Sequence, residues 1–227
     1  MIDCIIQARM GSSRLPGKVM MKIDSKNTIL DSMLNQLKYS KLIDRIIIAT
    51  TDKTEDNIIE KFCQKNKIEY FRGSEKDVLD RYYQCAKSKS SSIIVRMPAD
   101  KPLLDPNVVD EVIIEFQKNK YDYITTFLPS TFPSGTEVEI FSFSTLEKTW
   151  KDSKLPSERE HVTPYIYNNP KKFKILNFEN KTNLSKFRWA VDEKDDLLFV
   201  KKIISKLDKK PILISDVLNV IKNNPEI

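Results

Sequence analysis

Residues 5–18 combine the side chains and backbone features that bind phosphate groups. The segment passes from a short apolar stretch into a loop with two glycines, two serines and three cations. Glycines let the backbone approach an anion, loop N–H groups donate to its oxygens, and Arg9, Arg14 and Lys18 neutralise its charge. Three cations within ten residues indicate more than one phosphate group. A nucleoside triphosphate is therefore the first candidate ligand.

The spacing of this loop excludes two common nucleotide motifs. The segment is neither a Walker A loop nor a Gly-x-Gly-x-x-Gly dinucleotide fingerprint. Glycine and serine are also ordinary turn residues. Spacing alone therefore leaves a plain basic turn open beside an anion site.

Two aspartates follow stretches that we expect to be strands. Asp100 comes after the apolar run 93–97, and Asp192 comes after 187–191. Because the carboxyl ends of parallel strands form the ligand-binding edge of an α/β sheet, both aspartates belong near the loop. Two such carboxylates suit Mg²⁺, which takes oxygen ligands. The alternatives are a turn role for Asp100 and a helix N-cap role for Asp192, and Asp105 is expected to be only a cap.

Apolar strands alternate with amphipathic helical patterns in the first half of the chain. The pattern predicts strands at 2–8, 45–50, 69–71, 92–97 and 123–127 and helices at 29–39, 55–66, 77–88 and 106–119. Such alternation predicts an α/β fold with a Rossmann-like, mostly parallel sheet flanked by helices. Residues 9–18, called the phosphate loop below for their predicted ligand, follow the first strand at the edge where ligands bind.

The pattern changes near residue 128. A loop with two prolines leads into predicted strands at 136–143, 174–178 and 187–191 and helices at 144–151, 158–168 and 195–207. We expect one domain over residues 1–227, within which 128–186 is a small β/α insertion that faces the substrate.

Composition limits the classes of partner. The 227 residues are 40% hydrophobic and 31% charged, with a formal net charge of +6. The lysines are scattered and no basic run appears, which argues against nucleic acid. No apolar run approaches the ~20 residues of a membrane span. The odd set of Cys4, Cys63 and Cys85 matches no metal motif and predicts reduced thiols. Without a signal peptide pattern, we expect a cytoplasmic protein.

Further segments match one family in order. They are residues 71–74 with 77–83, then 100–106, 137–141, 160–165 and 188–192. Together with residues 5–18, they resemble the nucleotide-sugar cytidylyltransferases of the spore-coat-polysaccharide type and their deoxy-octulosonate and acylneuraminate relatives. The resemblance implies the fold of the nucleotide-diphospho-sugar transferases. It also implies Mg²⁺-dependent transfer of CMP from CTP to a sugar acid or similar small acceptor, phosphorylated and phosphonate acceptors included. Pyrophosphate would be released, and the product would serve surface polysaccharide biosynthesis.

The resemblance also implies roles for individual residues. Arg14, Lys18, Asp100 and Asp192 would be catalytic: the two cations would hold the β- and γ-phosphates and the two aspartates would bind the metal. Nucleotide contacts would come from Gln7, Ala8, Arg9, Gly11, Ser12, Ser13, Arg14, Lys18, Arg72, Ser74, Arg81 and Asp100. Ser74 can equally be an N-cap, and Arg81 can pair with a helix carboxylate.

Four residues are candidates for acceptor binding: Lys101, Glu137, Glu139 and His161. A comparable histidine faces the sugar acid in the deoxy-octulosonate enzymes, but a structural role for His161 is an equal alternative. Glu137 and Glu139 share one face of a predicted strand, which touches acceptor hydroxyls or faces water. Lys101 departs from the family, which has Cys or Glu there, and it either binds an acidic acceptor or points to solvent.

Two other functions remain open. A glycosyltransferase of similar fold usually carries Asp-x-Asp after a central strand, whereas this chain has Asp100-Lys101-Pro102. A non-catalytic nucleotide-binding subunit is the second alternative, against which the presence of Arg14, Lys18, Asp100 and Asp192 together argues. The family resemblance also implies a homodimer.

Overall fold

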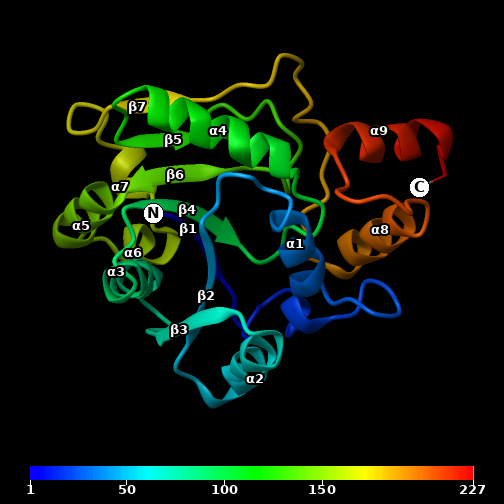
Figure 1. The fold of residues 1–227 in the computed structure, drawn as a ribbon, viewed down its shortest axis with the longest axis horizontal. Helices are drawn as coiled ribbons and strands as arrows, with labels where there is room; N and C mark the ends of the chain where they lie inside the picture. Colours follow the sequence, from blue (N-terminus) through cyan, green and yellow to red (C-terminus); the bar gives the residue numbers. More distant parts are fainter. Residues whose placement is uncertain (227) are drawn as a thin grey trace.

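The computed structural model describes residues 1–226 and contains one seven-stranded sheet with the order β3-β2-β1-β4-β6-β5-β7 (Figure 1). The strands are β1 Ile2–Gln7, β2 Arg45–Thr51, β3 Glu69–Gly73, β4 Ile93–Pro98, β5 Tyr123–Thr125, β6 Glu139–Ser142 and β7 Ile175–Asn177. Only β6 runs antiparallel to its neighbours β4 and β5. The predicted α/β class with a mostly parallel sheet is confirmed.

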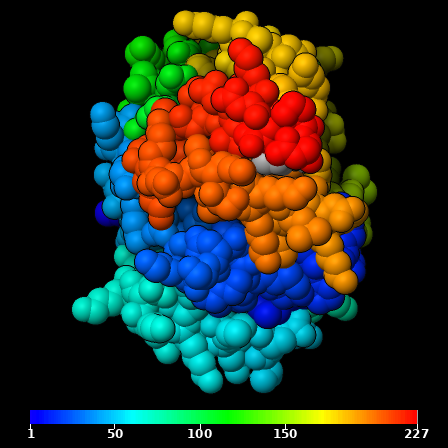
Figure 2. All heavy atoms as spheres, turned by 90° about the vertical axis from the view of Figure 1, so that its right-hand side faces the viewer, coloured from blue at the N-terminus to red at the C-terminus, as the bar shows by residue number. Residues whose placement is uncertain are grey.

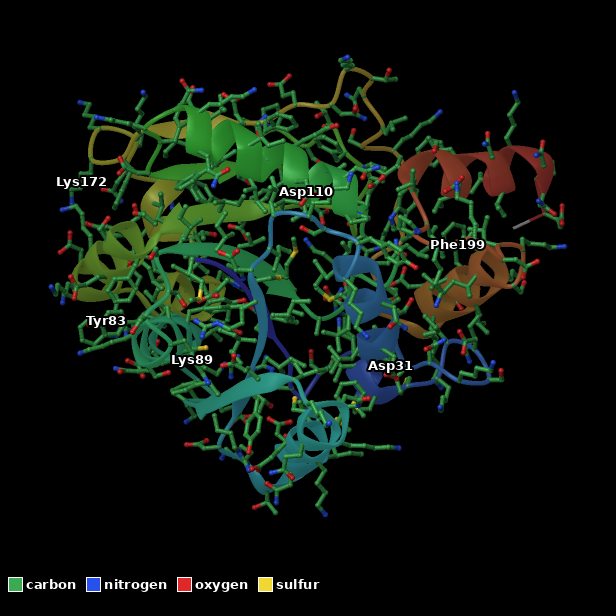
Figure 3. All side chains as sticks on the ribbon, viewed as in Figure 1. Asp31, Tyr83, Lys89, Asp110, Lys172 and Phe199 are labelled. Carbon is green, nitrogen blue, oxygen red and sulfur yellow. The ribbon has the colours of Figure 1, made fainter. Side chains whose placement is uncertain are left out.

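Helices cover both faces of this sheet. They are α1 Ile29–Leu37, α2 Asn57–Asn66, α3 Val78–Ser88, α4 Pro106–Lys118, α5 Phe143–Asp152, α6 Pro156–His161, α7 Pro164–Tyr167, α8 Lys194–Ile204 and α9 Ile214–Asn223, with short 3₁₀ helices η1 Lys18–Met20 and η2 Thr54–Asp56. A capping box between Thr28 and Asp31 fixes the start of α1, where Figure 3 labels Asp31.

The alternation of side chains along β1 explains why the strand is central. Cys4 and Ile6 belong to a buried cluster with α1, α2 and α4, whereas Ile5 belongs to a second cluster with α3 and α5. A parallel strand that is covered on both faces has apolar residues at nearly every position. The first strand therefore lies in the middle of the fold and delivers the following loop to the edge of the sheet.

A third buried cluster joins the two ends of the chain. Side chains of α8 and α9 pack with Leu15, Ile23 and Ile29 from the N-terminal segment and with Trp189. Figure 2 shows the C-terminal helices, in orange and red, directly against this N-terminal segment in blue. Phe199 of α8, labelled in Figure 3, packs against the same cluster. The phosphate loop is thus supported from behind by the last helices.

Two predictions about elements were wrong, and one helix was not predicted. Residues 187–191 form no strand, because the backbone of this segment pairs with a loop: Trp189 N–H donates to Ser134 C=O at 2.8 Å. The predicted helix 158–168 is two helices, because the chain turns at Val162, with φ of 73°, before Pro164. The helix α9 was not predicted, although Val217 and Val220 show its apolar spacing.

The segment 128–186 contributes to the main sheet. It supplies β6, which lies between β4 and β5, and β7 at the sheet edge. Its role toward a substrate or a second copy stays a prediction. Cys4, Cys63 and Cys85 are all free and buried, as expected. No helix within residues 1–226 is long and apolar enough to cross a membrane.

Candidate functional site

A cleft of about 380 Å³ lies where β1 and β4 end. Its lining combines residues from the phosphate loop, the end of β4, α3, α6 and the segment before α8. The lining residues are Gln7, Ala8, Arg9, Ser12, Ser13, Arg14, Lys18, Val19, Val78, Arg81, Arg96, Pro98, Ala99, Asp100, Glu160, His161 and Asp192. The structure therefore brings the predicted loop cations and both predicted aspartates to one cavity.

The backbone of Met10 organises the phosphate loop. Its C=O accepts hydrogen bonds from Ser12 N–H at 2.9 Å and from Gly17 N–H at 2.8 Å. Gly17 has a φ of 72°, a left-handed conformation that glycine adopts without strain. Met10 N–H donates at 2.6 Å to Asp56, which is fully buried. The loop is therefore a closed turn, and Asp56 holds it through the backbone of Met10.

Asp100 and Asp192 reach the cleft by different routes. Asp100 follows β4, as predicted. Asp192 does not follow a strand, and its position is set by a backbone hydrogen bond of 2.9 Å from Val191 N–H to the C=O of Asp100. The N-cap alternative for Asp192 was also wrong, since Glu193 is the N-cap of α8. The carboxylate of Asp105 caps α4, as expected, and also accepts from Ile214 N–H at 2.9 Å.

The segment that carries Asp192 is fixed by a close backbone contact. Gly135 has a φ of 103°, and a Cβ at this position would lie 2.6 Å from the backbone nitrogen of Ala190. Trp189 beside it is fully buried. Only glycine leaves room for the loop before β6 to pack on the segment 187–191.

Lys18 lies between the two aspartates. Its Nζ donates to Asp100 Oδ2 and to Asp192 Oδ1, both at 2.9 Å, and to Val191 C=O at 2.8 Å. The side chain of Lys18 is 12% exposed. One ammonium group thus contacts both carboxylates that were predicted to bind a metal.

Two arginines complete the surroundings of Asp192. Arg14 lies 3.0 Å from Asp192 Oδ1, and Arg188 lies 2.6 Å from Asp192 Oδ2. Burial alone would raise the pKa of Asp192, but hydrogen bonds from Lys18 and Arg188 outweigh burial and lower the pKa below its ordinary value. Asp192 is therefore an anion with acceptor oxygens aimed at the cleft.

Arg81 brings a buried positive charge to the cleft wall. Its side chain is 1% exposed, and its Nη1 donates at 3.0 Å to the C=O of Ser74. Burial lowers the pKa of Arg81, and its Nε has no hydrogen-bond partner in the described structure. No carboxylate of residues 1–226 forms an ion pair with Arg81, so the helix ion pair considered from the sequence is absent. A guanidinium that lines the cleft without an ion-pair partner is suited to an anionic ligand.

Arg72 and Ser74 lie outside the cleft lining. Arg72 donates to Asn57 at 2.7 Å and pairs with Glu60, so its guanidinium ties β3 to α2. Ser74 Oγ accepts from Asp77 N–H at 3.0 Å, but the N-cap of α3 is Asp77 and not Ser74. These contacts give both residues a structural role outside the cleft lining.

Lys101 is turned away from the cleft. Its Nζ lies 2.9 Å from Glu137 Oε2 and donates to Glu137 C=O at 2.7 Å. Burial would raise the pKa of Glu137, but Lys101 lowers it below the ordinary value. The side chains of Lys101 and Glu137 are 9% and 19% exposed, so the solvent-facing alternative for Lys101 was wrong.

Glu139 lies in a second buried polar network. It forms an ion pair with Arg96 and accepts from Tyr123 Oη at 2.6 Å. Arg96 also donates to Gln7 at 3.1 Å and lines the cleft. Glu137 precedes β6, and Glu139 is only 5% exposed. The two residues therefore do not form a shared strand face in contact with water, which was one of the alternatives from the sequence.

His161 reaches the cleft from α6. Glu160 beside it also lines the cavity, and both residues are exposed. Arg159 anchors this helix, because its Nε donates at 2.5 Å to Asp77, the N-cap of α3. His161 lines the same cavity as the loop cations, and its contact with an acceptor stays a prediction.

Sequence reasoning missed six lining residues: Val19, Val78, Arg96, Pro98, Ala99 and Glu160. A signal existed for Arg96, which is a single charge inside the apolar run 93–97. A charge within a buried strand needs a partner or a ligand. Glu160 was quoted only as part of a motif.

The donor set at Asp100 and Asp192 fits a divalent cation with oxygen ligands. Both carboxylates lie within hydrogen-bond distance of one ammonium nitrogen, so a single ion can contact both. Mg²⁺ takes one or two protein carboxylates and completes its shell with water and substrate phosphates. The described part of the chain contains no cluster of three or more potential ligand residues, so a metal at these two aspartates would take its other ligands from water and substrate phosphates.

Comparisons with known proteins agree with this geometry. Residues 4–213 match the family model described as Cytidylyltransferase. An uncharacterised protein of Methanocaldococcus jannaschii is 40% identical over 98% of this chain and 91% of its own length. A spore coat polysaccharide biosynthesis protein of Bacillus subtilis is 33% identical over 98% and 94%. The structure of a cytidylyltransferase from Leptospira borgpetersenii has 38% identity and a TM-score of 0.95, covering 99% of this chain and 95% of that one.

Proposed function

This chain belongs to the cytidylyltransferase family, and on that premise we propose that it transfers CMP from CTP to a sugar acid or similar small acceptor with release of pyrophosphate. Surface polysaccharide biosynthesis is the proposed use of the product, in keeping with the Bacillus subtilis relative. Phosphorylated and phosphonate acceptors remain within the proposal.

One observation carries the proposal. A single cleft at the sheet edge holds the loop cations Arg9, Arg14 and Lys18 together with Asp100 and Asp192. Cations and loop N–H groups suit a triphosphate, and two carboxylates suit the divalent ion that accompanies it. A plain basic turn would not require aspartates from two remote segments beside it.

The residues support an in-line displacement at the α-phosphate. The acceptor oxygen forms a bond to the α-phosphorus, the bond to the leaving pyrophosphate breaks, and the acceptor proton passes to solvent or a nearby base. Arg14 and the loop N–H groups offset the charge that grows on the leaving group. Asp100 and Asp192 would hold Mg²⁺, which when bound supplies Lewis-acid polarisation of phosphate oxygens. Positioning and charge stabilisation therefore account for most of the catalysis.

The acceptor end of the cleft differs from the sequence-based expectation. Lys101, Glu137 and Glu139 are occupied by buried ion pairs. Arg96, Glu160 and His161 line the cavity instead. We therefore assign acceptor contacts to Glu160 and His161, whereas the Arg96–Glu139 and Lys101–Glu137 ion pairs support the wall of the cleft.

Pyrophosphate release tests the proposal. The purified chain with Mg²⁺ and CTP is expected to release pyrophosphate only when a suitable acceptor is added, with ATP, GTP and UTP as base controls. The acceptor panel contains sugar acids, phosphorylated sugars and phosphonates, and mass spectrometry of the product identifies the CMP conjugate. Omission of Mg²⁺ tests the metal requirement. Release of a sugar from a nucleotide-sugar donor without pyrophosphate would point to a glycosyltransferase, and no turnover at all would point to a binding subunit.

Assembly and location remain part of the proposal. The family resemblance supports a homodimer in which segment 128–186 contacts a second copy, and it supports a cytoplasmic location. Light scattering at several protein concentrations tests the dimer, and cell fractionation tests the location.

A further inference from the structure

The ammonium group of Lys18 has no donor left for a ligand. Its Nζ makes three contacts, with Asp100 Oδ2, Asp192 Oδ1 and the C=O of Val191, at 2.8–2.9 Å. A lysine ammonium carries three N–H donors. In this arrangement Lys18 therefore cannot also donate to phosphate oxygens, which is the role that the family resemblance implies.

The same contacts place Lys18 where a divalent cation would bind. A single ion that bridges the two carboxylates through Asp100 Oδ2 and Asp192 Oδ1 would occupy the position of Lys18 Nζ. The two aspartates are only 21% and 17% exposed, so their charges are poorly screened and repel each other in the absence of a cation. An ammonium ion and a metal ion thus compete for one position.

We propose that Lys18 is a positioning residue that holds Asp100 and Asp192 together in the metal's place and leaves them when metal and nucleotide arrive. The inference rests on the proposed function, since the phosphates of the nucleotide provide the new partner for Lys18. With Lys18 at these two oxygens the site is assembled but blocked. In the complex, Lys18 moves to the phosphates and its position between the carboxylates opens to the metal, while Asp192 keeps Arg14 and Arg188 as cationic neighbours.

This exchange predicts an order of binding. A metal that enters the free protein must displace Lys18 without offering it a new anion, so its affinity is low. A nucleotide gives Lys18 an alternative partner and raises the affinity for the metal. By linkage, the metal raises the affinity for the nucleotide by the same factor.

The test is a titration with Mn²⁺ followed by electron paramagnetic resonance, with and without CTP. The proteins are wild type, Lys18→Met and the matched control Lys22→Met, in which the lost lysine is exposed and contacts only the C=O of Lys26. We expect Lys18→Met to bind Mn²⁺ about tenfold more tightly than wild type without nucleotide, since removing a competing cation frees the site. The gain in Mn²⁺ affinity on adding CTP should shrink in Lys18→Met and stay unchanged in Lys22→Met.

Equal or weaker Mn²⁺ binding by folded Lys18→Met would overturn the inference, because a residue with only a structural role would lower the affinity on removal. If Lys18→Met does not fold, as judged by circular dichroism, Lys18→Gln replaces it and must show the same gain. The titration without nucleotide does not depend on turnover. Failure of the proposed function would appear as no pyrophosphate release, and this outcome is therefore distinguishable from failure of the present inference.

Discussion

The carboxylate of Asp56 accepts a hydrogen bond of 2.6 Å from the backbone N–H of Met10, 46 positions earlier in the chain. Asp56 is fully buried, and its second oxygen accepts from the hydroxyl of Thr51. Since Met10 C=O also closes the turn through Ser12 and Gly17, one buried carboxylate holds the centre of the phosphate loop. Asp56 does not itself line the cleft.

Replacing Asp56 should disturb nucleotide binding through the loop. Asp56→Ala leaves Met10 N–H without an acceptor, which should cost about 1–3 kcal/mol of unfolding free energy and lower kcat/KM for CTP by about 10–100-fold. Asp56→Asn keeps an acceptor oxygen and should retain most activity. Steady-state kinetics and urea unfolding measure the two effects, and equal kinetic losses in both variants would argue against a positioning role.

Asp100→Asn should strongly lower turnover, while CTP binding measured without metal largely survives. The substitution removes one negative charge from the predicted metal site but leaves the loop cations in place, so kcat should fall by about 10²–10³-fold. Calorimetry with CTP and pyrophosphate release measure binding and rate separately. Asp110→Asn on α4, labelled in Figure 3, is a matched control, because Asp110 contacts Ser40 and Lys41 and not the cleft. Wild-type rates in Asp100→Asn would refute the metal assignment.

The Lys101–Glu137 pair should support the fold and not the acceptor. Lys101→Met leaves a buried carboxylate without its cation, which should cost about 3–5 kcal/mol of unfolding free energy. The double variant Lys101→Met/Glu137→Gln should recover much of this loss. Urea unfolding measures both. A changed KM for the acceptor with unchanged stability would instead restore Lys101 to the acceptor site.

Stability should fall in acid through Glu137. The pKa of this residue in the folded protein lies below its ordinary value of 4.5. A lowered carboxyl pKa stabilises the fold fully above the ordinary value, and this contribution is lost as the pH falls through the folded pKa. The difference in unfolding free energy between wild type and Glu137→Gln should therefore shrink between about pH 7 and pH 3. A constant difference in unfolding free energy across that range would contradict the lowered pKa of Glu137.

Local patterns and the family resemblance were enough to predict most of the sheet and all but six of the residues that line the cleft. The apolar run of β1 and the glycines after it are contiguous in sequence, so their periodicity and turn chemistry are readable. The capping role of Asp105 was readable for the same reason. These features depend on neighbours within a few positions.

The contacts of Lys101 and the conformation of segment 187–191 depend on partners that are distant in sequence. Whether Lys101 faces a ligand or a carboxylate is decided by Glu137, 36 positions away, and local spacing carries no information about that choice. The segment 187–191 has strand-like composition, yet it pairs with Ser134 in a loop. Burial of Trp189 satisfies its apolar pattern without a strand, so periodicity alone could not separate the two outcomes.

The backbone hydrogen bond from Val191 to Asp100 has a consequence for the protein during its synthesis. The loop around Met10 and then Asp100 leave the ribosome first. Asp192 follows more than ninety positions after Asp100, and its segment is fixed once Gly135 contacts Ala190. A growing chain can therefore complete the site only after the segment 187–192 and the two helices that pack behind the loop have been synthesised.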